Sequence, residues 1–220
     1  MIKCCIFDLD GTVLDTITTI THFVNFATGM NKIAPITEDE CKYFVGDGAR
    51  NLIIRTLRSK GISDTGTVEK VFGDYSSAYN ANPIYLTQVF AGVTDLLREL
   101  KANGIKLILV SNKPDEATQS VVKHFFEGFF DRVSGAVAEF PLKPDPSLAK
   151  SILNEFSIAP QECAWIGDTS TDMKTGKNLG VALNIGVLWG FRKREELESS
   201  GADVIVEKAS EILTEVKRIV

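Results

Sequence analysis

Residues 2–15 decide the fold class, and they read Ile-Lys-Cys-Cys-Ile-Phe followed by Asp-Leu-Asp-Gly-Thr-Val-Leu-Asp. The first six residues form a short apolar run of strand length, and Gly11 favours a turn after it. We therefore predict a strand that ends at Asp8 and Asp10. In open α/β sheets ligands bind beyond the carboxyl ends of the strands, so this pair is placed for chemistry. Taken alone, the segment is also compatible with an acidic surface turn.

The second half of the chain alternates between two kinds of hydrophobic pattern. Helical spacing recurs in one set of segments, residues 94–103, 115–126, 146–156, 170–179 and 209–219. Short apolar runs fall between them, at residues 106–110, 132–134, 163–166, 181–185 and 203–206. Strands separated by helices imply right-handed crossovers and a parallel sheet with helices on both faces. The fold class we expect is therefore α/β, with a doubly wound, Rossmann-like parallel sheet.

Residues 16–80 lack this alternation and carry helical spacing only. Thr37 and Glu40 form a capping box that predicts the start of one helix there. We expect a small all-helical domain inserted after the first strand. The predicted organisation is a core domain of residues 1–15 and 84–220 and a helical cap domain of residues 16–83.

Composition excludes several classes of protein. The chain has 220 residues, a formal charge of -5 and 44% hydrophobic residues, so it lacks the basic surface typical of nucleic-acid binding. No apolar run approaches the roughly 20 residues that span a bilayer, and no signal-peptide pattern begins the chain. We expect a cytoplasmic protein that contacts neither nucleic acid nor membrane. The sequence leaves its oligomeric state open.

Cysteine and histidine are too few and too scattered for most of their chemistries. The four cysteines show no metal-ligand spacing, so we expect them to be reduced core residues: Cys4, Cys5, Cys41 and Cys163. The two histidines, His22 and His124, lie in predicted helices and offer little material for a Ser/His/Asp triad. Any metal site must therefore be built from oxygen ligands.

Polar residues follow three of the predicted strands. Asp8 and Asp10 follow the first, Ser111 and Asn112 follow the second, and Asp168 follows a later one, four residues before Asp172. The carboxyl ends of parallel strands lie along one edge of the sheet, so these side chains converge. Lys143 precedes a predicted helix and falls between them in the sequence.

These residue types suit phosphoryl transfer. Carboxylates alone repel a phosphate monoester, so we expect Mg²⁺ between them, held by Asp8, Asp168 and the backbone of Asp10. Ser111, Asn112, Thr12 and backbone amides near Gly11 are the candidate phosphate ligands. Lys143 supplies a fixed positive charge for the nucleophile and the transferred group.

The ordered motifs resemble those of the haloacid dehalogenase superfamily of phosphohydrolases. The matches are Asp8 to Thr12 for DxDGT, Ser111, Lys143, and Gly167 to Asp172 for GDxxxD. The resemblance implies that Asp8 is the nucleophile and that Asp10 protonates the leaving oxygen and later activates water. It also implies that Mg²⁺ binds Asp8, the Asp10 carbonyl and Asp168, with Asp172 beside it. Dehalogenase relatives lack the second aspartate, so Asp10 disfavours dehalogenation.

Substrate choice in this family lies mostly in the cap. The loop of residues 45–50 is similar to that of phosphoglycolate-phosphatase-like members, and Arg50 is our candidate ligand for a substrate carboxylate or second phosphate. A surface arginine beside a helix-start turn is the simpler alternative. We expect a phosphatase acting on a small phosphorylated metabolite, with phosphoglycolate favoured. Pyrophosphatase, nucleotidase, phosphosugar phosphatase and β-phosphoglucomutase activities, or a catalytically silent phospho-ligand-binding module, remain alternatives.

Overall fold

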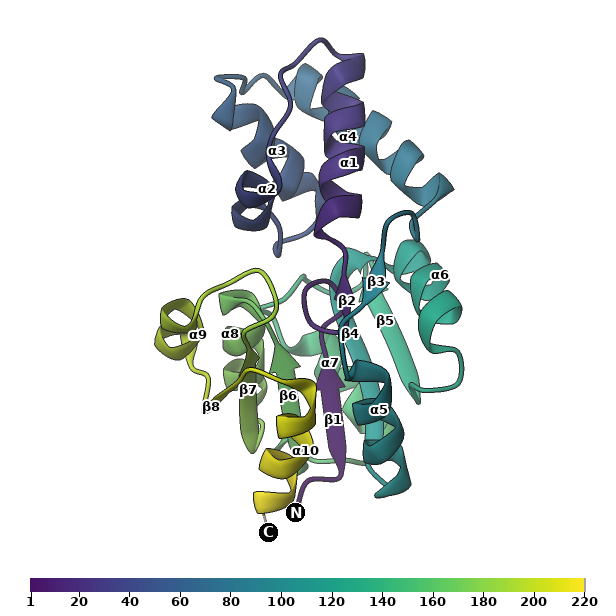
Figure 1. Cartoon of the computed structure of the whole chain (residues 1–220), viewed down its shortest axis with the longest axis vertical. Helices are drawn as coiled ribbons and strands as arrows, with labels where there is room; N and C mark the ends of the chain where they lie inside the picture. The colour runs from purple at the N-terminus through teal and green to yellow at the C-terminus, as the bar shows by residue number, and fades with distance from the viewer. Residues whose placement is uncertain (220) are drawn as a thin grey trace.

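A six-stranded parallel sheet forms the centre of the computed structural model, which describes residues 1–219 (Figure 1). Its strand order is β5-β4-β1-β6-β7-β8, and all five neighbouring pairs run parallel. The strands are β1 (Cys4–Phe7), β4 (Lys106–Pro114), β5 (Arg132–Ala136), β6 (Cys163–Gly167), β7 (Leu183–Val187) and β8 (Val204–Val206). The predicted α/β fold class is confirmed.

Helices cover both faces of this sheet because successive strand side chains point to opposite sides. In β1, Cys5 and Phe7 join one hydrophobic cluster, while Cys4 and Ile6 join the other. The first cluster packs under α5 (Val93–Ala102), α6 (Asp115–Phe126) and α10 (Ala209–Arg218). The second packs under α7 (Ser147–Phe156), α8 (Ser170–Leu179) and α9 (Arg194–Ser200), and a short 3-10 turn, η1 (Pro160–Glu162), precedes β6.

The register of β1 sets the position of the site. Phe7 pairs with Leu109 of β4 on one side and with Ile166 of β6 on the other. The residues that follow Phe7, Leu109 and Ile166 therefore lie at the same level, along the carboxyl edge of the sheet. Asp8 follows β1 directly, and Asp168 follows β6 directly.

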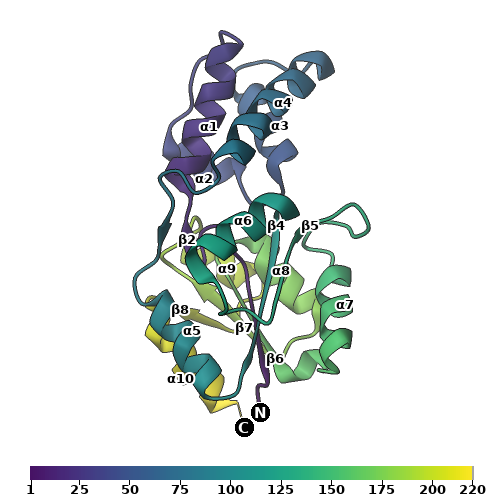
Figure 2. The ribbon, with the colours of Figure 1, turned by 90° about the vertical axis from the view of Figure 1, so that its right-hand side faces the viewer.

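Four helices stand beyond that edge and have a hydrophobic cluster of their own (Figure 1). They are α1 (Ile17–Met30), α2 (Glu38–Phe44), α3 (Ala49–Ser59) and α4 (Thr65–Ala81), which we call the helical segment. The predicted capping box is present, with Thr37 and Glu40 each accepting a backbone N–H of the other. Figure 2 shows the helical segment above the sheet, close to α6, and Ala117 of α6 packs into its cluster.

A short ribbon joins the helical segment to the sheet. β2 (Leu14–Asp15) pairs antiparallel with β3 (Gln88–Val89). The two stretches of chain that connect the helical segment to the sheet therefore lie side by side. The sequence did not predict this ribbon because each strand is only two residues long.

Two of the predicted element boundaries that differ from the structure lie next to candidate site residues. The strand predicted at residues 106–110 continues to Pro114, so Ser111 and Asn112 lie within β4. The helix expected to start at residue 146 begins at Ser147, and the Asp145 carboxylate accepts the Ser147 N–H at 2.9 Å. The four cysteines are buried and free, as predicted. Among residues 1–219, no helix is both long enough and apolar enough to cross a membrane.

Candidate active site

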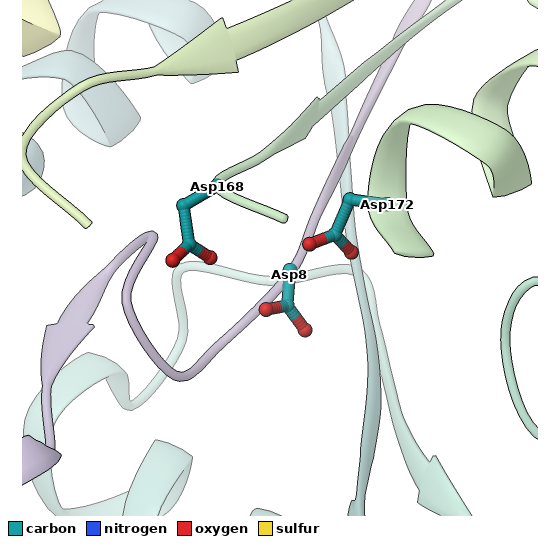
Figure 3. Close-up of side chains that lie close together, drawn as sticks. All are labelled: Asp8, Asp168 and Asp172. Carbon is teal, nitrogen blue, oxygen red and sulfur yellow. The ribbon is translucent and has the colours of Figure 1, made fainter. Parts of the chain in front are cut away.

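Three buried aspartates converge at the carboxyl edge of the sheet. Asp8 follows β1, Asp168 follows β6, and Asp172 lies in the first turn of α8. One carboxylate oxygen from each lies within 4.8 Å of the others, and Figure 3 shows the three carboxylates facing one another. Oxygen ligands at this spacing match the preference of hard divalent cations.

Lys143 joins two of these carboxylates. Its Nζ donates to Oδ1 of Asp8 at 2.6 Å and to Oδ1 of Asp172 at 2.7 Å, and it also lies 3.2 Å from the Val110 carbonyl oxygen. With the three aspartates ionised, one ammonium leaves the cluster with a net charge of -2. That charge is the complement of one dication.

Burial makes this cluster unfavourable without a cation. The pKa of Asp8 is raised to about 7, because burial and then the Asp172 carboxylate raise it more than Lys143 lowers it. Burial likewise raises the pKa of Asp168 well above its usual range, aided by Asp172 and Asp8. The two carboxylates next to Lys143 raise the pKa of its ammonium despite burial, so it stays charged.

Asp168 is held tightly by its neighbours. Its Oδ1 accepts the Thr12 hydroxyl at 3.1 Å and its Oδ2 accepts the Phe191 N–H at 2.7 Å. Gly11 and Gly190 press against it, since a Cβ on either would lie 2.3 Å from an Asp168 side-chain atom. The absence of a side chain at Gly11 and Gly190 therefore leaves the space that the Asp168 side chain occupies.

These contacts change our expectation for two phosphate ligands. The Thr12 side chain is buried, and its hydroxyl already serves Asp168. The Gly11 N–H donates to the Leu14 carbonyl at 2.8 Å. Neither residue lines the pocket described below. In this arrangement Thr12 and Gly11 support a candidate metal ligand, and their role as phosphate ligands stays a prediction.

Asp172 has both carboxylate oxygens occupied. Oδ1 accepts Lys143, and Oδ2 accepts the Thr169 hydroxyl at 2.6 Å in a capping box at the start of α8. A Cβ at Gly167 would lie 2.3 Å from the Asp172 Cβ, so glycine is required for this approach. The GDxxxD spacing therefore places an N-terminal helix carboxylate over the end of β6.

Ser111 and Asn112 have different surroundings, although both line the pocket. The Ser111 hydroxyl accepts the Lys113 N–H at 3.2 Å and keeps its own proton free to donate. The Asn112 amide group is fully used: Oδ1 accepts the Lys143 N–H at 2.8 Å, and Nδ2 donates to the carbonyls of Lys143 and Gly46. Asn112 therefore positions Lys143, whereas Ser111 is available to a ligand.

Lys113 is a site residue that we did not predict. Its Nζ lies 2.9 and 3.0 Å from the two carboxylate oxygens of Asp10, and its side chain is only 5% exposed. Position 113 carries no spacing signal, because Asp10 is 103 residues away in the sequence. The extension of β4 past Asn112 would have been the only clue. Since the Asp10 carboxylate faces Lys113, only its backbone carbonyl is left for the predicted metal role.

A cavity of about 100 Å³ lies between this cluster and the helical segment. The core contributes Asp8, Asp10, Ser111, Lys113 and Lys143 to its lining. The helical segment contributes mostly apolar and aromatic side chains, namely Ile20, Ala49, Leu52, Tyr75 and Tyr79. A lining of apolar and aromatic side chains with a few polar groups is typical of small-molecule sites.

The loop of residues 45–48 closes one side of the cavity. Asn112 donates to the Gly46 carbonyl at 3.0 Å, and the Thr171 hydroxyl donates to the Asp47 carboxylate at 2.8 Å. Arg192 donates to the Val45 carbonyl at 2.9 Å and also to the Lys42 carbonyl. The structure thus places the Arg192 side chain against the loop.

Arg50 does not reach the cavity. Its guanidinium pairs with Glu69 of α4, both side chains are about half exposed, and Arg50 lines a separate pocket with Ile54 and Arg58. This arrangement therefore does not bring Arg50 to the cavity, and its role as a substrate ligand stays a prediction. The loop turns at Gly48, and α3 then carries Ala49 to the cavity and Arg50 away from it.

Comparisons with known proteins agree with this geometry. Residues 5–185 match the family model of haloacid dehalogenase-like hydrolases. A phosphoglycolate phosphatase from Rhodospirillum rubrum is 29% identical over 211 residues, which cover 92% of this chain and 86% of that protein. One from Vibrio vulnificus is 29% identical over 220 residues, covering 96% and 95%.

A crystal structure from Lactobacillus delbrueckii subsp. bulgaricus has the same fold. Its TM-score is 0.92 at 30% identity, covering 97% of this chain and 98% of that one, and its assignment as a phosphoglycolate phosphatase is itself a prediction. The chain belongs to the haloacid dehalogenase-like hydrolases. Within that family it is a phosphatase that resembles the phosphoglycolate phosphatases.

Proposed function

We propose that this phosphatase hydrolyses a small phosphate monoester through an aspartyl-phosphate on Asp8, with Mg²⁺ as cofactor. One observation carries the proposal: Lys143 bridges Asp8 and Asp172 beside Asp168, so the buried cluster has a net charge of -2 when all three carboxylates are ionised. A buried cluster of this charge is unfavourable alone and becomes favourable with a dication and a phosphoryl group.

In the first step the Asp8 carboxylate attacks phosphorus and the bond from phosphorus to the ester oxygen breaks. Asp10 gives its proton to that oxygen as the alcohol leaves. In the second step a water molecule gives a proton to Asp10 and attacks phosphorus. The bond from Asp8 to phosphorus breaks, inorganic phosphate leaves and both aspartates regain their starting forms.

Mg²⁺ suits the donor set. Asp8 and Asp168 would hold it, with the Asp10 carbonyl and with Asp172 beside it, and the purely oxygen surroundings favour a hard cation. When bound, the ion offsets the charge on the phosphoryl oxygens during transfer. Lys143 keeps Asp8 oriented, and the Ser111 hydroxyl is placed to donate to a phosphoryl oxygen.

We also propose that residues 16–83 act as a cap domain on a core of residues 1–15 and 84–220. The separate hydrophobic cluster of the helical segment and its position over the cavity support this division. Phosphoglycolate is the favoured substrate, supported by the names of the relatives and by the small cavity.

Phosphate release tests this function. We would assay phosphoglycolate, pyrophosphate, nucleotides and sugar phosphates with Mg²⁺ and with a chelator, using Asp8→Asn as the inactive variant and Arg50→Ala as the matched variant outside the cavity. We expect Mg²⁺-dependent release that Asp8→Asn abolishes and Arg50→Ala leaves within about twofold. A mutase would release no phosphate, and a silent binding module would turn over nothing.

A further inference from the structure

A second lysine lines the cavity, and the proposed mechanism gives it no task. Lys143 and Lys113 are the two cationic side chains among the described residues of the lining. Lys143 is held between two aspartates, but Lys113 touches only one, Asp10. Its ammonium also lies 4.6 Å from the centre of the Tyr79 ring. An ammonium has three N–H donors, so Lys113 can serve a further acceptor.

Tyr79, whose ring lies against this ammonium, carries a second hydrogen-bond donor. This residue of α4 is 3% exposed, and its hydroxyl has no hydrogen-bond partner within residues 1–219. Burial raises the pKa of Tyr79 well above its usual value, so the hydroxyl keeps its proton. A buried hydroxyl without a partner is unfavourable, and a ligand oxygen placed there would remove that cost.

The remaining walls on this side are mostly apolar, with Tyr75, Ser76 and Asn80 of α4 as further polar side chains. Ile20, Ala49 and Leu52 of the helical segment face the same cavity, with Phe191 on the core side. In such a pocket a few polar groups set the orientation and choice of ligand. A buried ammonium and a buried hydroxyl, both donors, select an oxygen anion.

We propose that Lys113 and Tyr79 bind a carboxylate on the leaving part of the substrate and so select phosphate esters of small hydroxy acids. This inference rests on the proposed function, because the phosphoryl group at Asp8 fixes which end of the substrate reaches these residues. Lys113 then shares its N–H donors between Asp10 and the substrate carboxylate. Lys113 of β4 then binds the substrate carboxylate, a role for which the sequence made Arg50 the candidate.

A pair of non-hydrolysable ligands tests this recognition without turnover. 3-Phosphonopropionate carries a carboxylate where propylphosphonate carries a methyl group, and calorimetry with Mg²⁺ gives both dissociation constants. We expect the wild type to bind the carboxylate ligand at least about tenfold more tightly. Lys113→Met should remove most of that preference, and Tyr79→Phe, which deletes only the hydroxyl, should reduce it by about three- to tenfold.

The control is Lys150→Met, which removes an exposed lysine of α7 and should leave the preference unchanged. Equal binding of the two phosphonates by the wild type would overturn the inference. A preference that survives in both Lys113→Met and Tyr79→Phe would overturn it as well. Because the inference concerns a ratio, a general loss of affinity from disturbing Asp10 does not affect it.

Turnover separates this inference from the proposed function. We expect the ratio of kcat/KM for phosphoglycolate to that for ethyl phosphate to fall at least about tenfold in Lys113→Met. If neither ester releases phosphate while the phosphonate preference holds, the proposed function is wrong and the carboxylate site stands. If both esters are hydrolysed with equal kcat/KM by the wild type, the function stands and the recognition by Lys113 and Tyr79 is refuted.

Discussion

The Nζ of Lys143 lies 2.6 Å from Oδ1 of Asp8, and both side chains are more than nine-tenths buried. Neither charge can be removed without leaving the other in a medium that solvates it poorly. The pair therefore links the stability of the core to the readiness of the proposed nucleophile.

Replacing this lysine tests both properties. In Lys143→Met, Asp8 and Asp172 lose their shared ammonium, and we expect the free energy of unfolding to fall by about 3–5 kcal/mol, together with loss of phosphatase activity. Chemical denaturation and phosphate release measure the two effects. Lys150→Met, on the exposed face of α7, should change stability by no more than about 0.5 kcal/mol. Equal stability of the two variants would refute this reading of the pair.

The raised pKa values predict how stability depends on pH in the absence of divalent cations. The pKa of Asp8 is raised to about 7 in the folded protein, against about 3.9 in an unfolded chain. The folded state therefore binds more protons between these values, and the stability present below about pH 4 is lost as pH rises through about 7. Thermal unfolding in a chelating buffer should show a falling Tm over that range.

Asp168→Asn should restore part of the stability that the metal-free protein loses as the pH rises. An asparagine can still accept the Phe191 N–H and donate to the Thr12 oxygen, while it removes a buried charge. We expect the variant to be more stable than the wild type at pH 7.5 without metal, by at least about 1 kcal/mol. Its Tm should no longer rise on addition of Mg²⁺. A wild-type Tm that does not respond to Mg²⁺ would contradict the metal site itself.

Gly190 gives a test of the close packing around Asp168. A Cβ there would lie 2.3 Å from the Asp168 Cβ and 2.4 Å from the Gly11 carbonyl oxygen. We expect Gly190→Ala to destabilise the protein by about 1–3 kcal/mol and to weaken its thermal response to Mg²⁺. Gly73→Ala is the matched control, because nothing lies within 4 Å of its Cβ in α4, and it should stabilise by about 0.5–1 kcal/mol.

Arg192 ties the core to the loop of residues 45–48. Arg192→Ala removes its hydrogen bonds to the carbonyls of Val45 and Lys42, so the loop should exchange its amide hydrogens faster. We expect KM to rise several-fold, by about 1 kcal/mol of lost binding, with a smaller change in kcat. Arg194→Ala, two residues away, removes only exposed ion pairs and serves as control. Unchanged exchange in the loop would show that Arg192 does not hold it.

Local signals were sufficient to predict most of the fold. Residues 115–126 and 170–179 form helices with the predicted ends because their apolar spacing and end residues agree, and Asp8 and Asp168 follow buried strands. The strand predicted at residues 181–185 lies instead at Leu183–Val187, since burial by neighbouring strands, which no local pattern records, decides its register.

The unpredicted parts of the site depend on contacts between distant segments. Lys113 reaches Asp10 only because β4 lies beside β1 and continues past Asn112. Arg50 points away because of its rotational position on α3, and a glycine-rich loop leaves that rotation undetermined in the sequence. Thr12 matches the DxDGT motif, but its hydrogen bond to Asp168 was not predicted, because the two residues are 156 positions apart in the sequence.

Trapping the acyl phosphate tests the central claim most directly. Enzyme mixed with phosphoglycolate and Mg²⁺ is quenched with acid within milliseconds and reduced with borohydride, which converts a phosphorylated aspartate to homoserine. Peptide mass spectrometry then locates the change. We predict homoserine at position 8 in the wild type and no such change in Asp8→Asn. Phosphate release with position 8 unmodified, or with full activity in Asp8→Asn, would contradict the account.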